Sequence, residues 1–128
     1  ASIVGIPGQD ITNVTLRNIQ LVYPGNSNPN YAYRGTKPAD LDSIPEMTAA
    51  YPEFSQFKEL PAWGFYVRHA KNVKFENVTL TAEGKEYRPA IVLDDVKGAT
   101  FSGMKYNEPG GSKKQLHVYK SSGVIQKK

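Results

Sequence analysis

The segment at residues 72–80 reads NVKFENVTL, and the same order of residue types occurs at 13–21 (NVTLRNIQL) and at 98–106 (GATFSGMKY). A fourth copy starts at residues 123–126 (GVIQ). A unit that recurs in this way is the sequence signature of a stacked-repeat architecture, in which neighbouring units bury one continuous core. The repeat therefore indicates the fold class, and it marks much of the chain as scaffold.

The apolar residues of each copy are spaced by two, then three, then two positions. In the first copy Val14 and Leu16 face one side, and Ile19 and Leu21 face the same side after a longer step. A strand alternates its faces with a period of two. The step of three therefore indicates a corner at which the chain turns while its apolar face stays on the same interior.

Two positions of every copy are occupied by Asn or Gly. The entry position holds Asn13, Asn72, Gly98 and Gly123, and the corner position holds Asn18, Asn77 and Gly103. Both residue types tolerate a positive φ. We therefore expect two left-handed bends in each coil of the chain.

A further pair of apolar residues precedes each entry position at a constant offset. These pairs are Phe65 and Val67, Ile91 and Leu93, and Leu116 and Val118. Each coil is thus expected to hold three short strands joined by tight corners. A leucine-rich repeat has a similar period, but it requires a Leu-x-x-Leu-x-Leu strand and usually a helix, and no helix fits between these strands. An immunoglobulin-like sandwich would not place Asn or Gly at identical offsets.

The pattern predicts an all-β fold, a right-handed parallel β-helix (a solenoid) of about four coils. We expect one domain over residues 1–128, with a long loop insertion at 24–63. The expected coils lie at about 2–23, 64–82, 90–107 and 115–128.

The insertion is rich in Pro, Asn, Gly and Tyr and carries six of the chain's fourteen aromatic residues. A short helix is predicted from Asp42 to about Tyr51, because Ser43 can cap it and Pro45 suits a first turn. Most of the aromatic residues are expected to pack the insertion against the coils. Tyr51 and Trp63 are the candidates for stacking on a sugar ring.

Composition excludes several classes of function. Cysteine is absent, which excludes disulfides, thiolate catalysis and zinc–thiolate sites. No apolar run is long enough to cross a bilayer, and no signal peptide is visible. The net charge of +4 would suit a polyanion, but the cations are scattered in the sequence, so a solvated surface is the favoured interpretation. We expect neither a nucleic-acid nor a membrane partner.

Charged residues occupy equal offsets on successive coils. Arg68 and Asp94 share one position, and His69, Asp95 and Lys120 share the next. Neighbouring strands lie about 4.8 Å apart, so these side chains should form ladders on the outer surface. The favoured interpretation is cross-strand ion pairs that hold the register. The alternative is a polar cleft able to do acid–base chemistry. No His, Asp and Glu group has metal-ligand spacing, and we predict no metal site, no cofactor and no catalytic residue.

The segments at residues 60–73 (LPAWGFYVRHAKNV) and 88–96 (RPAIVLDDV) resemble the C-terminal coils of bacterial polygalacturonase-like proteins, which are pectin-degrading glycoside hydrolases. This resemblance implies a pectin lyase-like right-handed parallel β-helix and a periplasmic or extracellular location. The active site of that family draws on Asn-Thr-Asp, Asp-Asp, Gly-His-Gly and Arg-Ile-Lys segments. Only the Asp94-Asp95 pair occurs here, at a position expected in a terminal coil.

The leading hypothesis is therefore a non-catalytic C-terminal portion of a polygalacturonase-like protein, which completes or caps the solenoid and contacts an acidic polysaccharide. The alternative is a stand-alone carbohydrate-binding module, with Arg68, His69 and Lys71 beside Tyr51 and Trp63 as its substrate-binding residues. A third hypothesis is a structural unit that associates with itself. An uncapped end of a solenoid exposes apolar side chains and strand edges, so we expect a homo-oligomer through the N-terminal coil end.

Overall fold

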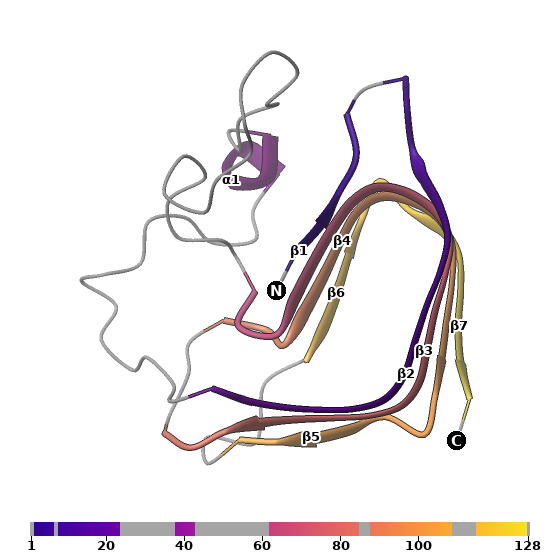
Figure 1. Cartoon of the computed structure of the whole chain (residues 1–128). Coiled ribbons are helices and arrows are strands. Elements are labelled where there is room, and N and C mark those ends of the chain that lie inside the picture. Colours follow the sequence, from indigo (N-terminus) through magenta and orange to yellow (C-terminus); the bar gives the residue numbers. More distant parts are fainter. Residues whose placement is uncertain are drawn as a thin grey trace.

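The protein is mostly β-strand and forms one seven-stranded sheet with parallel strands (Figure 1). The computed structural model describes residues 2–6, 8–23, 38–42, 62–84, 88–108 and 115–127. Its strands are β1 (Ser2–Val4), β2 (Ile11–Tyr23), β3 (Phe65–Ala82), β4 (Ile91–Ser102), β5 (Lys105–Asn107), β6 (Leu116–Tyr119) and β7 (Ser122–Lys127), and its described helix is α1 (Pro38–Asp42).

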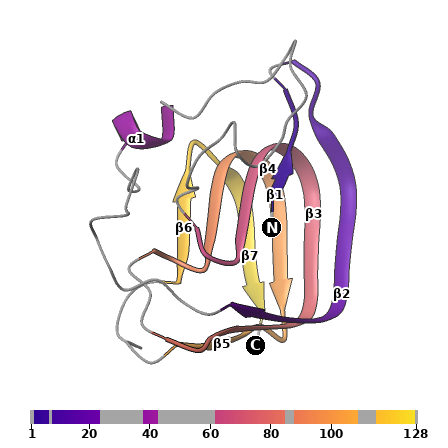
Figure 2. The same ribbon diagram turned by 60° about the vertical axis from the view of Figure 1, so that its left-hand side comes forward.

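The strands form four successive layers. β1 and β2 both pair with β3, β4 and β5 pair with the opposite edge of β3, and β6 and β7 pair with β4. All of these pairs are parallel, which excludes an immunoglobulin-like sandwich because that fold is built from antiparallel sheets. Figure 2 shows β2, β3 and β4 side by side, each following the curve of its neighbour.

The strands bend together at residues with left-handed backbone conformation. Asn13, Asn18, Asn72, Asn77, Gly98, Gly103 and Gly123 all have positive φ, as the sequence predicts. The register confirms that they are aligned, since Thr12 and Val14 pair with Lys71 and Val73 on either side of the Asn13 and Asn72 bend. Short separate strands were expected, but β3 and β4 run on through their bends. A single residue with positive φ turns the chain, and the ladder resumes at once on the other side.

A third set of bends was not predicted. His69, Asp95 and Lys120 also have positive φ, at 54°, 55° and 51°. Asp and His are enriched in this conformation relative to most residues, but far less than Gly. The Asn or Gly that marks the other two bends is absent from these positions, so the sequence carries only a weak signal for this bend.

The core lies inside the bends and is built from aligned apolar positions. The 2-3-2 spacing is confirmed by the register, which places Val14 beside Val73, and Leu16 beside Phe75. Residues of β3 and β4 at these positions are fully buried, including Val73, Phe75, Val78 and Leu80. The ring of Phe75 stacks on that of Phe101 with centroids 4.9 Å apart and meets Phe65 edge-on at 5.3 Å.

A second apolar cluster lies on the outer side of the sheet, beneath α1. Leu41 of the helix is fully buried against Tyr66 and Val92, with Val4 and Tyr119 at the margin. Burial of this outer face contradicts one expectation from the sequence. The Arg68 and Asp94 ladder was predicted on the exposed surface, whereas both residues are buried, at 7% and 2% exposure. The strand pattern alone does not reveal that a segment far away in the sequence covers this face.

Helix α1 ends at Asp42, where the predicted helix was expected to begin. The remainder of that prediction, up to Tyr51, lies outside the described residues. Among the residues that the structure describes, no helix has the length and apolar character needed to cross a membrane.

Candidate functional site

Two polar surfaces of the sheet could carry a function. One is a groove near the bend at Asn18 of β2 and Asn77 of β3, and the other is a cluster of titratable side chains at the bend of His69. We call them the outer groove and the corner cluster. Each is built from positions that the register brings together from separate layers.

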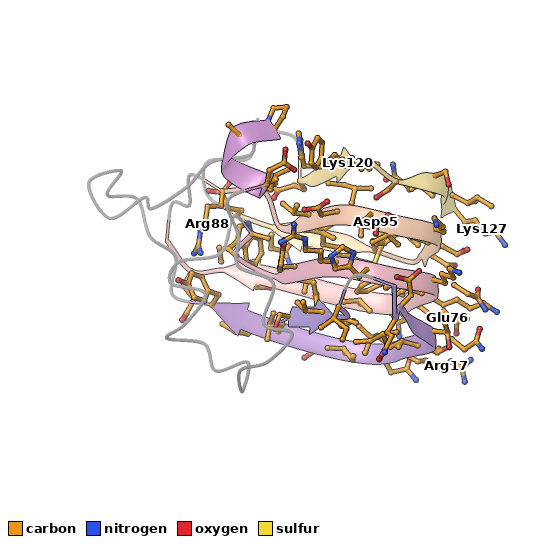
Figure 3. All side chains as sticks on the ribbon, turned by 90° about the horizontal axis from the view of Figure 1, so that it is seen from above. Arg17, Glu76, Arg88, Asp95, Lys120 and Lys127 are labelled. Atoms are coloured by element: carbon orange, nitrogen blue, oxygen red, sulfur yellow. The ribbon has the colours of Figure 1, made fainter. Side chains whose placement is uncertain are left out.

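The outer groove has a volume of about 540 Å³. Its lining combines three cations, one carboxylate and several neutral polar groups: Arg17, Lys74, Lys127, Glu76, Asn18, Asn77, Thr100, Ser102 and Gly103. These residues come from β2, β3, β4, the bend that follows β4, and β7. Figure 3 shows Arg17, Glu76 and Lys127 projecting from the same side of the molecule.

The charges of the groove are partly paired. Nε of Arg17 donates a hydrogen bond of 2.6 Å to Glu76, and both side chains are partly exposed. This hydrogen bond lowers the pKa of Glu76 below its usual value. With Glu76 ionised, the lining keeps an excess of two positive charges, from three cations against one anion. A concave surface with this balance favours an anionic ligand.

The floor of the groove is a short ladder of corner amides. Nδ2 of Asn77 donates to Oδ1 of Asn18 at 2.8 Å. Gly103 continues the stack in the next layer, and a Cβ atom at this position would lie 3.4 Å from Cα of Asn77. Because Gly103 has no side chain, the ladder of amides ends at Asn77, and no side chain from the next layer covers the Asn77 amide at this bend.

The corner cluster joins three layers at the positive-φ bends. Nδ1 of His69 lies 2.7 Å from Oδ2 of Asp95, within hydrogen-bonding distance. Asp10, from the connection between β1 and β2, completes the group, and one ligand atom of each residue lies within 4.8 Å of those of the other two. The side chain of His69 is 11% exposed, whereas that of Asp95 is 37% exposed.

A glycine allows the first layer to approach this corner. The amide of Gly5 donates to the carbonyl of Arg68 at 2.9 Å. A Cβ atom on Gly5 would collide with the carbonyl oxygen of His69. The connection that carries Asp10 can therefore lie against the bend of β3 only because residue 5 has no side chain.

The neighbouring charged residues of this corner are engaged elsewhere. Nε of Arg68 lies 3.3 Å from Oδ2 of Asp94. Burial raises the pKa of Asp94, and the positive charge of Arg68 opposes this shift only in part. Lys120 holds the same bend position in the next layer, but its Nζ donates to Asp42 of α1 at 3.1 Å.

The predicted substrate-binding residues that the structure describes do not form one surface. Arg68 is buried in its ion pair, and Trp63 is 3% exposed, with its ring stacked on Tyr23 at 6.5 Å. Lys71 is exposed, with its Nζ 3.8 Å from Oδ2 of Asp10. His69 belongs to the corner cluster, and Tyr51 lies outside the described residues. The packing interpretation of the insertion aromatics accounts for the position of Trp63.

Arg88 fixes the Trp63 side of the core. Its guanidinium lies over the ring of Tyr23, 5.4 Å from the centroid, and Nη2 donates to the Tyr23 hydroxyl at 3.0 Å. In Figure 3 Arg88 lies at the opposite side of the molecule from Arg17. This buried arginine therefore takes no part in the outer groove.

Sequence reasoning missed both the outer groove and Asp10. Arg17, Lys74 and Lys127 are far apart in the sequence, but a signal existed, because all three lie at outward positions of the repeat and Arg17 precedes the predicted corner at Asn18. Asp10 carried no such signal, since it precedes the repeat. The sequence shows no His, Asp and Glu group with metal-ligand spacing, whereas the folded chain brings Asp10, His69 and Asp95 together.

Comparison with known proteins identified no relative of this chain. No protein-family model, no curated protein and no solved structure matches the chain.

Proposed function

We propose that the chain is a right-handed parallel β-helix and that it acts as a non-catalytic portion of a polygalacturonase-like, carbohydrate-active protein. Four parallel layers with aligned bends support the β-helix, because crossovers between parallel strands are right-handed in nearly all proteins. The resemblance of residues 60–73 and 88–96 to that family supports the biological context. In this proposal the chain completes the solenoid and binds an acidic polysaccharide.

The observation that carries the binding function is the charge of the outer groove. Arg17, Lys74 and Lys127 converge from three layers onto one hollow whose other polar groups are amides, hydroxyls and the single carboxylate of Glu76. A uronate sugar offers a carboxylate to the cations and hydroxyls to the neutral groups. Successive layers would present these groups at intervals of about 4.8 Å along an extended glycan.

Calorimetry with oligogalacturonides tests this proposal. We expect heat of binding that falls as salt is added, because exposed charges are screened. The double variant Lys74→Gln and Lys127→Gln should abolish most of the binding. Lys97→Gln is the matched control, since Lys97 is exposed on β4 but does not line the groove. Absence of heat with the parent chain, or equal loss with the control, contradicts glycan binding in the groove.

The non-catalytic part of the proposal has its own test. Incubation with polygalacturonate should release no new reducing ends, with or without the groove variants. Turnover by the purified chain that is lost in a His69→Asn variant would assign acid–base chemistry to the corner cluster instead.

Self-association is the second candidate function, and the burial of the first layer favours it. Ile3, Val14, Leu16 and Ile19 pack against the core but stay partly exposed, because β3 covers them from one side only. The last layer is similar, since Val118 is 38% exposed. A second copy could cover the apolar end and pair with the outer edge of β2. Sedimentation at micromolar concentration distinguishes a dimer or trimer from a monomer, and Leu16→Gln should shift an oligomer toward the monomer.

A further inference from the structure

We propose that Asp10, His69 and Asp95 form a binding site for a divalent transition-metal ion of the Zn²⁺ class. The site is distinct from the outer groove and does not depend on glycan binding. One ligand atom from each residue lies within 4.8 Å of the other two. An ion that approaches a common point between them can therefore contact all three side chains after small rotations.

The type of donor selects the class of metal. Imidazole nitrogen suits zinc, copper, iron and nickel, whereas magnesium and calcium prefer oxygen ligands alone. Zinc sites that keep a further position open use three protein ligands, and one imidazole with two carboxylates supplies that number. Asp95 is 37% exposed and Asp10 is 17% exposed, so an ion there would remain accessible to water.

The backbone holds the three donors in place before any ion binds. His69 and Asp95 occupy the same bend position on adjacent parallel strands, both with positive φ. Asp10 is brought to the same corner by the close approach of Gly5 to the backbone of residues 68 and 69. Donors on three hydrogen-bonded layers lose little conformational freedom on binding, which favours affinity.

The charge balance of the cluster also favours a cation. Two carboxylates share one imidazole. Lys71 forms an ion pair with Asp10 at 3.8 Å, but its amine is 51% exposed and supplies one positive charge against the two carboxylates. Lys120, which holds the next bend position, is directed to Asp42.

Metal titration of the chelator-treated full chain tests the site. With Zn²⁺ we expect calorimetry to give one ion per chain and a Tm that rises with metal concentration. With Co²⁺ we expect a visible absorption band that Zn²⁺ abolishes. His69→Asn removes the imidazole, and Asn tolerates the positive φ of this position. It should weaken binding by about tenfold or more, at least as much as the loss of an outer-shell partner.

The chain provides a matched control, because it contains two histidines. His117→Asn should leave the affinity for the metal unchanged. Asp42→Asn, which removes a carboxylate outside the site, should leave it unchanged as well. If His69→Asn fails to fold, Asp10→Asn tests the same site from a connection outside the strands, and it too should weaken binding. No saturable binding by the parent chain, or loss of binding with His117→Asn while His69→Asn retains it, would overturn the proposal.

Discussion

Nε of Arg68 lies 3.3 Å from Oδ2 of Asp94, and the two side chains are only 8% and 3% exposed. The residues hold one register position on adjacent strands, β3 and β4. They lie beside the apolar cluster that Leu41 of α1 forms with Tyr66 and Val92. The charges are thus paired across the sheet in a place where water cannot solvate them.

Removal of one member of this pair should destabilise the protein strongly. Arg68→Met leaves the Asp94 carboxylate buried without its nearest cation, and such a change costs about 3–5 kcal/mol. The double variant Arg68→Met with Asp94→Leu should recover much of that loss, because a buried pair is often replaced by apolar residues at little cost. Urea unfolding of the two single variants and the double variant measures the coupling directly.

The exposed pair of Arg17 and Glu76 is the control for this cycle. Nε of Arg17 lies 2.6 Å from Oε2 of Glu76, closer than the 3.3 Å that separates the Arg68 and Asp94 atoms, but the side chain of Arg17 is 63% exposed. Arg17→Met should therefore change the free energy of unfolding by about 0–1 kcal/mol. If Arg68→Met lowers the free energy of unfolding no more than Arg17→Met does, burial does not increase the contribution of the Arg68 pair to stability.

The bend at Gly103 gives a second prediction. Its φ is 65°, and a Cβ atom there would find ordinary contact distances to Asn77. The cost of Gly103→Ala should therefore come from the backbone conformation, at about 1–2 kcal/mol. Gly103→Asn should cost less, because Asn adopts this conformation at the equivalent positions 18 and 77. Equal losses in thermal or urea unfolding would show that steric contact, not φ, decides the residue at this bend.

The repeat was predictable from the sequence because its corners need a rare backbone conformation. Asn and Gly at fixed offsets gave the positions of Asn13, Asn18, Asn72 and Asn77, and the 2-3-2 spacing gave the residues that face the core. Both signals are local, since φ and strand periodicity are properties of short segments. The pairing of β3 with β4 followed from aligning those segments.

The candidate sites depend on contacts that no local pattern carries. Asp10 reaches His69 because Gly5 permits a close backbone approach across layers. Leu41 of α1, far away in the sequence, packs on Tyr66 and Val92, and Arg68 and Asp94 are buried on the same face of the sheet. The third bend was not predicted because its positions hold His69, Asp95 and Lys120 rather than the Asn or Gly that marks the other two bends. Sequence reasoning therefore aligned His69 with Asp95 but did not include Asp10.

The aromatic stack of the core gives a third prediction. Phe75 is fully buried between Phe101, at 4.9 Å, and Phe65, at 5.3 Å. Phe75→Ala removes both ring contacts and leaves a cavity, so it should cost about 3–5 kcal/mol in the free energy of unfolding. Val22→Ala is the control, because Val22 is 61% exposed and its truncation should stay within about 0.5 kcal/mol. A small loss for Phe75→Ala would mean that neighbouring layers collapse into the space.

The contact between Asp42 of α1 and Lys120 predicts how stability depends on pH. Hydrogen bonds from Lys120 and Tyr119 lower the pKa of Asp42 below 3.8, and the bond to Asp42 raises the pKa of Lys120 above 10.5. The stabilisation from ionised Asp42 should be complete above pH 3.8 and should be lost as the pH falls through its lowered folded-state pKa. The stabilisation from charged Lys120 should be complete below pH 10.5 and lost as the pH rises through its raised pKa.

The difference in Tm between the parent and Asp42→Asn should thus be largest between these limits and should shrink at both extremes of pH. It should also diminish with added salt, because the pair is exposed. Glu83→Gln, which removes an exposed carboxylate outside this contact, should not reproduce the profile. A Tm difference that persists unchanged at low pH would mean that Asp42 holds α1 by its shape or position rather than by its charge.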